Sequence, residues 1–313
     1  MGRSGIRPGP LLERLMIDLL TVLVDGILYS SWLFIIAVGL TLIYGVMKIL
    51  NMAHGSLYAL GAYAAASLVG FWLNHGYAPL GSYGMLALAA VMVGLVMGPL
   101  IERGLFRFLY GKDEILLLIV TFALFLILED VIKLIWGVDP YFVSEPYGLL
   151  GTLDFGGLSY PGYSLIMVGV SIAIGIGLLW VLQYTIQGKL LLAVIHDREV
   201  SLAMGINVNR FYLITFTVGA MLAAVGGAFT APTVSVVPGM GVEVIVLAFA
   251  VVVIGGLGSL QGAALGALIV GLVRSAAVHY LPEIELFSIY LVMALVLLLK
   301  PQGLFSSVEA RKI

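Results

Sequence analysis

The hydrophobic positions of the chain form long continuous runs separated by short connections that contain polar, glycine or proline residues. Most runs approach the roughly 20 residues that an α-helix needs to cross a bilayer. The pattern predicts an all-α polytopic membrane protein with about eight or nine transmembrane helices, forming a single transmembrane domain over residues 1–313. The predicted helices cover residues 27–47, 52–70, 83–101, 115–136, 162–184, 211–230, 243–255, 262–280 and 286–300.

The apolar stretch over residues 39–66 is interrupted in its middle by polar residues, including Asn51 and His54. Asn51 is a favourable N-cap, so a half-helix is expected to begin directly after it. Gly55 and Gly61 then allow close helix packing. A broken helix is tolerated in a membrane only where its free backbone groups are buried in protein or face water. The stretch therefore predicts a solute pathway, with His54 lining it; an ordinary polar loop between two helices is the alternative.

A second interrupted run covers residues 247–274, where glycines break the helix and Ser259 provides another N-cap. Paired interrupted segments in two halves of a chain are typical of a transporter's central site. We therefore predict a two-half repeat with broken helices at its centre. The residues predicted to line the substrate pathway are Asn51, His54, Gly55, Tyr58, Gly61, Gly255, Gly256, Gly258, Ser259, Gln261 and Gly262.

Basic residues assign the connections to the two sides of the membrane. Segments 103–112, 189–210 and 311–312 each carry Lys or Arg, which the positive-inside rule places in the cytoplasm. Residues 137–162 carry three acidic residues and no Lys or Arg, and residues 231–241 carry no charge. Both of these connections are predicted to face outward.

The first 26 residues or so are predicted to be a cytoplasmic lead-in. A secretory signal is disfavoured, because Asp18 and Asp25 interrupt its would-be apolar core. A cytoplasmic start followed by three crossings would, however, place segment 103–112 outside. Three solutions stay open: an extra inserted segment within residues 11–45, a partial crossing by residues 39–66, or an N-terminus on the outer side.

Composition supports the membrane class and excludes several others. The chain is 62% hydrophobic and only 10% charged, whereas soluble domains carry about 25% charged residues. A net charge of −2 argues against a nucleic-acid partner. The absence of cysteine excludes structural disulfides and thiolate metal sites. The sequence contains no Walker A motif, zinc-protease motif or nucleophile elbow, so it predicts no catalytic residue and no enzymatic activity of its own.

Three groups of charged residues are expected to be structural. Arg274 lies within a late run, and we expect it to snorkel or to pair with Glu283 or Glu285. Glu243 suits the positive end of a helix dipole.

Glu129, Asp130 and Lys133 share one helix at spacings of three and four, so they are expected to neutralise one another. Replacing both Glu129 and Lys133 by glutamine should then be tolerated.

The cytoplasmic connection over about residues 185–211 is the second informative region. It contains an amphipathic stretch from Lys189 to Met204, followed by Gly205, which is a common helix C-cap. This stretch predicts a short rigid helix that docks on a partner; an ordinary surface helix is the alternative.

Several separated motifs resemble one known family. Gly188, Ala193, Asp197 and Gly205-Ile206-Asn207 resemble the coupling loop of ATP-binding-cassette importer permeases. Together with further motifs, they resemble the branched-chain amino-acid permeases of bacteria over about residues 20–306. These further motifs are residues 39–45, Asn51-x-x-His54-Gly55, Gly61-Ala62-Tyr63, Pro238-Gly-Met-Gly241, residues 255–259 and Lys300-Pro-Gln-Gly303-Leu-Phe305. The ATPase-coupling residues that the resemblance implies are Gly188, Lys189, Ala193, His196, Asp197, Arg198, Gly205, Ile206 and Asn207.

The resemblance implies a multi-pass subunit of the bacterial inner membrane that translocates branched-chain or related amino acids. Its implied partners are two ATPase subunits, a second related permease or a second copy, a periplasmic binding protein and the lipid bilayer. ATP and magnesium belong on the ATPases, and no cofactor or metal is expected on this chain. Urea or short amides are alternative solutes, and an ion-coupled secondary transporter or a passive channel is the alternative class.

Overall fold

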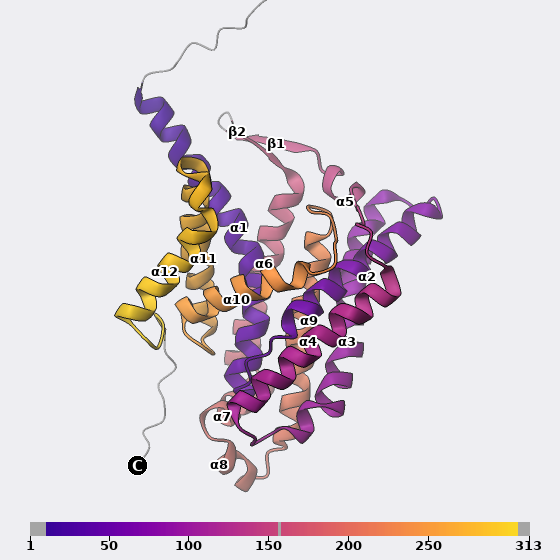
Figure 1. Cartoon of the computed structure of the whole chain (residues 1–313), viewed down its shortest axis with the longest axis vertical. Helices are drawn as coiled ribbons and strands as arrows, with labels where there is room; N and C mark the ends of the chain where they lie inside the picture. The colour runs from indigo at the N-terminus through magenta and orange to yellow at the C-terminus, as the bar shows by residue number, and fades with distance from the viewer. Residues whose placement is uncertain (1–10, 156–157, 306–313) are drawn as a thin grey trace, which may run out of the picture.

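The computed structural model describes residues 11–155 and 158–305. Within this part the chain forms twelve α-helices and one antiparallel pair of short strands (Figure 1). The helices are α1 (Leu11–Met47), α2 (His54–Asn74), α3 (Ser82–Gly104), α4 (Glu114–Trp136), α5 (Glu145–Gly148), α6 (Gly162–Tyr184), α7 (Ile186–His196), α8 (Arg198–Ala203), α9 (Val208–Thr230), α10 (Met240–Gly255), α11 (Leu260–Tyr280) and α12 (Glu285–Leu299). The strands are β1 (Thr152–Phe155) and β2 (Leu158–Pro161).

All nine predicted hydrophobic runs are helical, which confirms the all-α polytopic membrane fold. Eight segments in the described residues are long and apolar enough to span a membrane. The exception among the nine is α10, whose 16 residues extend over only about 24 Å. α10 is therefore a half-helix held inside the bundle, as the broken pattern of the late run predicted.

The two ends of the bundle differ in charge. The start of α1, the β1–β2 pair and α5 lie at one end, and α7 and α8 lie at the other (Figure 1). The basic connections that follow α3 and α6, with Arg103, Arg107, Lys189 and Arg198, belong to the α7–α8 end. The positive-inside rule assigns that end to the cytoplasm.

This arrangement resolves the conflict in the first hundred residues. α1 starts at the outer end and runs toward the cytoplasmic end, so α1, α2 and α3 together bring segment 103–112 to the cytoplasmic side. Residues 11–26, predicted to be part of a cytoplasmic lead-in, instead form the first turns of α1. Residues 1–10 of that lead-in, and the basic pair at 311–312, lie outside the described residues.

α9 lies at the centre of the bundle and packs against α1, α2 and α3. Small residues make these contacts possible, since a side chain at Gly61 would collide with the backbone of Ala224 in α9. Lipid provides no hydrophobic drive for helix association. The helices are therefore held together by the van der Waals contacts that such close backbone approaches allow.

The two helix breaks lie beside each other. Residues 48–53 separate α1 from α2, and residues 256–259 separate α10 from α11. A Cβ atom at Gly45, in the last turns of α1, would lie 3.3 Å from the carbonyl oxygen of Gly258. Segments distant in sequence therefore meet at the point where both helices stop.

The capping residues of the two breaks behave differently. Ser259 accepts a hydrogen bond from the Gly262 amide at 3.0 Å, so it caps α11 as predicted. Asn51 does not cap α2: the helix begins at His54, and its N-cap residue is Ala53. The Asn51 side chain is fully buried, and neither of its polar atoms has a hydrogen-bond partner in the described chain.

The predicted cytoplasmic helix is divided in two. Asp197 ends α7 and caps α8, since its carboxylate accepts a hydrogen bond from the Val200 amide at 2.9 Å. Gly205 ends α8 in the left-handed conformation, with φ +82°. The Gly205 amide donates to the Leu202 carbonyl, and the Ile206 amide to the Ser201 carbonyl, both at 3.0 Å. This paired pattern confirms Gly205 as the helix terminator.

The end of the described chain returns to α10. The Leu304 amide donates to the Ile254 carbonyl at 3.0 Å, and the Phe305 amide donates to the Gly255 carbonyl at 2.8 Å. The last turn of α10 is thus bound to the segment that follows α12.

Candidate functional site

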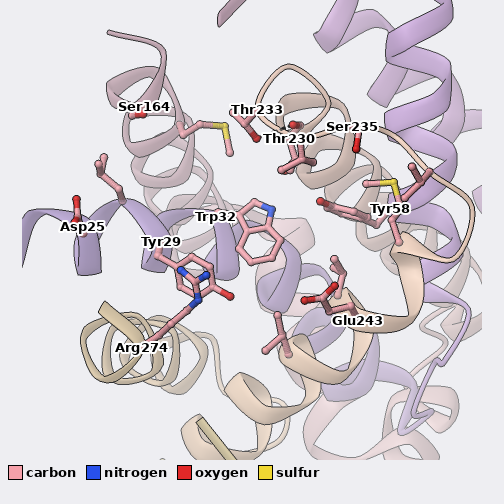
Figure 2. Close-up of a pocket in the computed structure, with 17 residues that line it drawn as sticks. Asp25, Tyr29, Trp32, Tyr58, Ser164, Thr230, Thr233, Ser235, Glu243 and Arg274 are labelled. Carbon is pink, nitrogen blue, oxygen red and sulfur yellow. Dashed lines mark hydrogen bonds between the residues drawn. The ribbon is translucent and has the colours of Figure 1, made fainter. Parts of the chain in front are cut away.

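A cavity of about 610 Å³ opens in the outer half of the bundle. α1, α2, α6, α9, α10, α11 and the connection at 231–239 contribute to its walls (Figure 2). Its outer position follows from Asp25, whose carboxylate has the Tyr160 hydroxyl of β2 as a polar neighbour. The labelled residues of Figure 2 are Asp25, Tyr29, Trp32, Tyr58, Ser164, Thr230, Thr233, Ser235, Glu243 and Arg274.

Arg274 of α11 is held by two neighbours at one side of the cavity. Its guanidinium group forms an ion pair with Glu285 of α12, which confirms one of the two predicted pairings. The same group lies over the ring of Tyr29, 3.9 Å from the ring centroid. Both contacts fix the guanidinium group against α1 and α12.

Glu243 lies in the first turn of α10, as predicted, and its carboxylate extends into the cavity (Figure 2). The side chain is exposed. Among the residues that the structure describes, no cation lies within ion-pair distance of it. Its negative charge is therefore not neutralised by a direct partner.

A different carboxylate occupies the N-terminus of α10. Glu129 of α4 is 5% exposed and accepts a hydrogen bond from the Gly239 amide at 2.9 Å. Lys133 pairs instead with Asp130, at 3.0 Å. The expectation that the three residues form one neutral group is wrong, since Glu129 makes a contact between helices and the other two residues lie on the surface.

Aromatic side chains form the centre of the cavity. Tyr58 is 1% exposed, and its hydroxyl has the Thr230 hydroxyl and the Trp32 indole as polar neighbours. The Trp32 contact does not reach hydrogen-bond geometry, so the buried indole N–H has no hydrogen bond within the described residues.

Tyr58 is the one residue of the predicted substrate pathway that lines this cavity. His54 is fully buried, and its Nε2 atom lies 3.0 Å from the Ile36 carbonyl oxygen. It is therefore a hydrogen-bonded side chain of the protein interior. Several predicted glycines serve close backbone packing, where an added Cβ would collide: Gly55 against Gly241, Gly61 against Ala224, Gly255 against Gly262, Gly262 against Gly255, and Gly256 against Phe305.

Gly258 and Ser259 lie in the turn between α10 and α11, and Gln261 lies in the first turn of α11. Gln261 borders a smaller hollow of about 360 Å³ with mostly apolar walls. The structure thus separates most of the predicted pathway residues from the outer cavity, and their role in transport stays a prediction.

The predicted coupling residues gather at the cytoplasmic end, on and around α7 and α8. Gly188 is buried, because α7 turns there against the last turn of α6, and Ile206 is half-buried. The exposed members are Lys189, Ala193, His196, Asp197, Arg198, Gly205 and Asn207. They lie beside exposed apolar side chains, including Val200 and Met204, and together form a mixed surface at the end of the molecule.

Sequence reasoning missed the α1 side of the cavity. Asp25, Tyr29 and Trp32 follow one another at spacings of four and three, which places them on one helix face. An acidic residue within an apolar run was the available signal, because such residues commonly mark functional sites in membrane helices.

Comparison with known proteins adds the family context. The family model described as "Branched-chain amino acid transport system / permease component" matches residues 22–299. The permease protein BraD of the high-affinity branched-chain amino acid transport system of Pseudomonas aeruginosa is 29% identical over 93% of this chain and 97% of its own length. The probable branched-chain amino acid transport permease protein LivH of Methanocaldococcus jannaschii is 30% identical, covering 93% of this chain and 94% of that protein.

A solved structure, PsaBC from Streptococcus pneumoniae in complex with Fab, resembles the fold with a TM-score of 0.50. The two chains are 15% identical, and the match covers 92% of this chain and 95% of the other. At this identity the likeness concerns the fold alone.

Proposed function

Because this chain belongs to the family of permease components of branched-chain amino acid transport systems, we propose that it is the membrane-spanning subunit of an ATP-binding-cassette importer. The solutes are branched-chain or related amino acids, and the location is the inner membrane of a bacterium. The family match over residues 22–299 carries the proposal, since it includes both helix breaks and the α7–α8 segment.

The surface at α7 and α8 is the proposed docking site for an ATPase subunit. Short capped helices keep their shape on contact, because Asp197 and Gly205 fix the two ends of α8. Exposed apolar side chains such as Met204 supply area to bury against a partner. In this proposal two ATPases bind and hydrolyse ATP with magnesium, while this chain holds no cofactor and catalyses no reaction.

At the outer end, the proposed partner is a periplasmic binding protein, which would deliver the solute to the cavity of Figure 2. A second related permease, or a second copy of this chain, completes the membrane unit.

The two buried carboxylates of the described chain do not favour an ion-coupled secondary transporter. An ion-coupled secondary transporter normally uses buried ionisable groups as ion sites. The buried carboxylates Glu102 and Glu129 instead accept hydrogen bonds from Tyr110 and the Gly239 amide. Urea and short amides remain alternative solutes within the same class of importer.

Reconstitution tests the proposal. The chain is assembled in vesicles with its partner permease, the two ATPases and the binding protein, and uptake of labelled leucine, urea and acetamide is measured. We expect leucine uptake that requires hydrolysable ATP and the binding protein. Uptake driven by an ion gradient without the ATPases would instead indicate a secondary transporter, and flux through this chain alone would indicate a channel.

A further inference from the structure

We propose that the outer cavity binds the ammonium end of the transported amino acid, and that Glu243 is the residue that recognises it. The inference rests on the proposed function for the identity of the solute. It assigns a specificity-determining residue to a cavity within a single permease chain.

The positive groups around the cavity are already engaged. Arg274 is paired with Glu285 and stacked on Tyr29. The N-terminus of α10, which would otherwise attract an anion through the helix dipole, is occupied by the Glu129 carboxylate. A solute carboxylate would have to displace one of these bonded carboxylates.

Glu243 is free by comparison. Glu243 extends between Tyr29 and Tyr58 without an ion-pair partner in the described chain (Figure 2). Of the charged residues in the described chain that line the cavity, Asp25 and Glu243 are negative and Arg274 is positive, and Arg274 is already neutralised by Glu285. An ammonium group would form a charge-assisted hydrogen bond with Glu243 in a site that already favours cations.

Two hydroxyl groups of the wall are also acceptors for a ligand. The Thr230 hydroxyl donates its proton to the Gly226 carbonyl at 2.6 Å. The Thr233 hydroxyl donates to the Thr230 carbonyl at 2.7 Å. With their protons used, both oxygens can only accept a hydrogen bond. The Thr230 oxygen has the Tyr58 hydroxyl as a neighbour, so the Thr233 oxygen is the clearer acceptor for an ammonium group.

The rest of the wall fits an apolar side chain. Trp32 and Tyr58 add aromatic surface to the wall, and Leu28, Met167 and Leu247 add aliphatic surface. The volume of about 610 Å³ lies within the range of small-molecule sites. The cavity therefore combines an acceptor-rich side with an apolar side, as an aliphatic amino acid requires.

The test measures ligand preference of the full-length chain in lipid nanodiscs by saturation-transfer NMR. Three probes separate the two charges: L-leucine, 3-methylbutylamine, which lacks the carboxylate, and 4-methylpentanoate, which lacks the ammonium group. We expect the first two to bind and the third to bind at least about tenfold more weakly, since the charge-assisted bond to Glu243 is lost.

Variants assign the preference to Glu243. Glu243→Gln should weaken 3-methylbutylamine binding about tenfold, whereas Glu243→Asp should retain the preference for the amine. Glu283→Gln is the matched control, because it removes an exposed outer carboxylate that does not line the cavity.

Three results would overturn the inference: equal binding of the amine and 4-methylpentanoate, no amine binding, or unchanged amine binding in a folded Glu243→Gln variant. The measurement needs no ATPase or binding protein. Failure of ATP-dependent uptake would therefore count against the proposed importer, and loss of amine preference would count against the Glu243 assignment alone.

Discussion

Replacing Glu129 by alanine tests how the half-helix α10 is held in the bundle. The carboxylate is 5% exposed, and it accepts the Gly239 amide proton at 2.9 Å across 110 residues of sequence. Gly239 has a φ of +88°, so the chain enters α10 through a left-handed turn that this hydrogen bond stabilises. The contact joins α4 directly to the start of α10.

The magnitude follows from two losses. Leaving a partly buried amide unpaired costs about 1–3 kcal/mol, and removing a carboxylate from a helix N-terminus costs about 0.3–1 kcal/mol more. We expect Glu129→Ala to destabilise the protein by about 2–4 kcal/mol. Glu129→Gln keeps an acceptor of similar shape and loses only the charge, so its cost should be about 1 kcal/mol.

Asp130→Asn provides the matched control on the same helix. Asp130 is 73% exposed and pairs with Lys133 on the surface, so its replacement should cost less than about 1 kcal/mol. Thermal stability of the purified variants in nanodiscs is the assay, with leucine uptake by the assembled complex as the second readout. Equal stability of Glu129→Ala and Asp130→Asn would refute the reasoning, as would full tolerance of the combined Glu129→Gln and Lys133→Gln change.

The other expectations concern coupling, topology and packing. Gly205→Val should lower solute-stimulated ATPase activity in the assembled complex, because a β-branched residue resists the φ of +82°; unchanged coupling would remove Gly205 from the coupling segment. A tag inserted after Gly151 should react with an impermeant reagent from outside, and a tag after Arg198 only from inside; the reverse labelling would invert the topology. Gly61→Ala should cost about 1–3 kcal/mol, because its Cβ meets backbone atoms of α9, whereas Gly84→Ala enters open space and should be neutral. Equal thermal stability of these two variants would contradict the packing described for α2 and α9.

The helices could be predicted because apolar length is a local property of the sequence. The exception was α1, whose first turns contain Asp18 and Asp25. In the structure Asp18 lies 3.6 Å from His279 of α11, and Asp25 has the Tyr160 hydroxyl of β2 as a polar neighbour. These partners are far away in sequence, so the two acidic residues predicted only an interruption of the apolar run and a cytoplasmic lead-in.

The site was less predictable for the same physical reason. Spacing suggested that Lys133 neutralises Glu129, but the fold presents Glu129 with the Gly239 amide, a donor that no local pattern reveals. Asn51 has the chemistry of a cap, yet the turn at residues 52 and 53 starts α2 without its side chain. The cavity similarly depends on α1, α10 and α11 meeting, which is a property of the packed bundle.

α10 is attached at both of its ends, and this has a mechanical consequence. Its N-cap residue, Gly239, is tied to α4 by Glu129, and its last turn is hydrogen-bonded to Leu304 and Phe305. A helix of 16 residues is stiff on this length scale, so a displacement of the segment after α12 would reach the other end of α10 with little loss. Glu243 lies on α10, one helical turn from the Gly239–Glu129 contact. A strain applied at Leu304 and Phe305 would therefore arrive in the cavity as a movement of the Glu243 carboxylate.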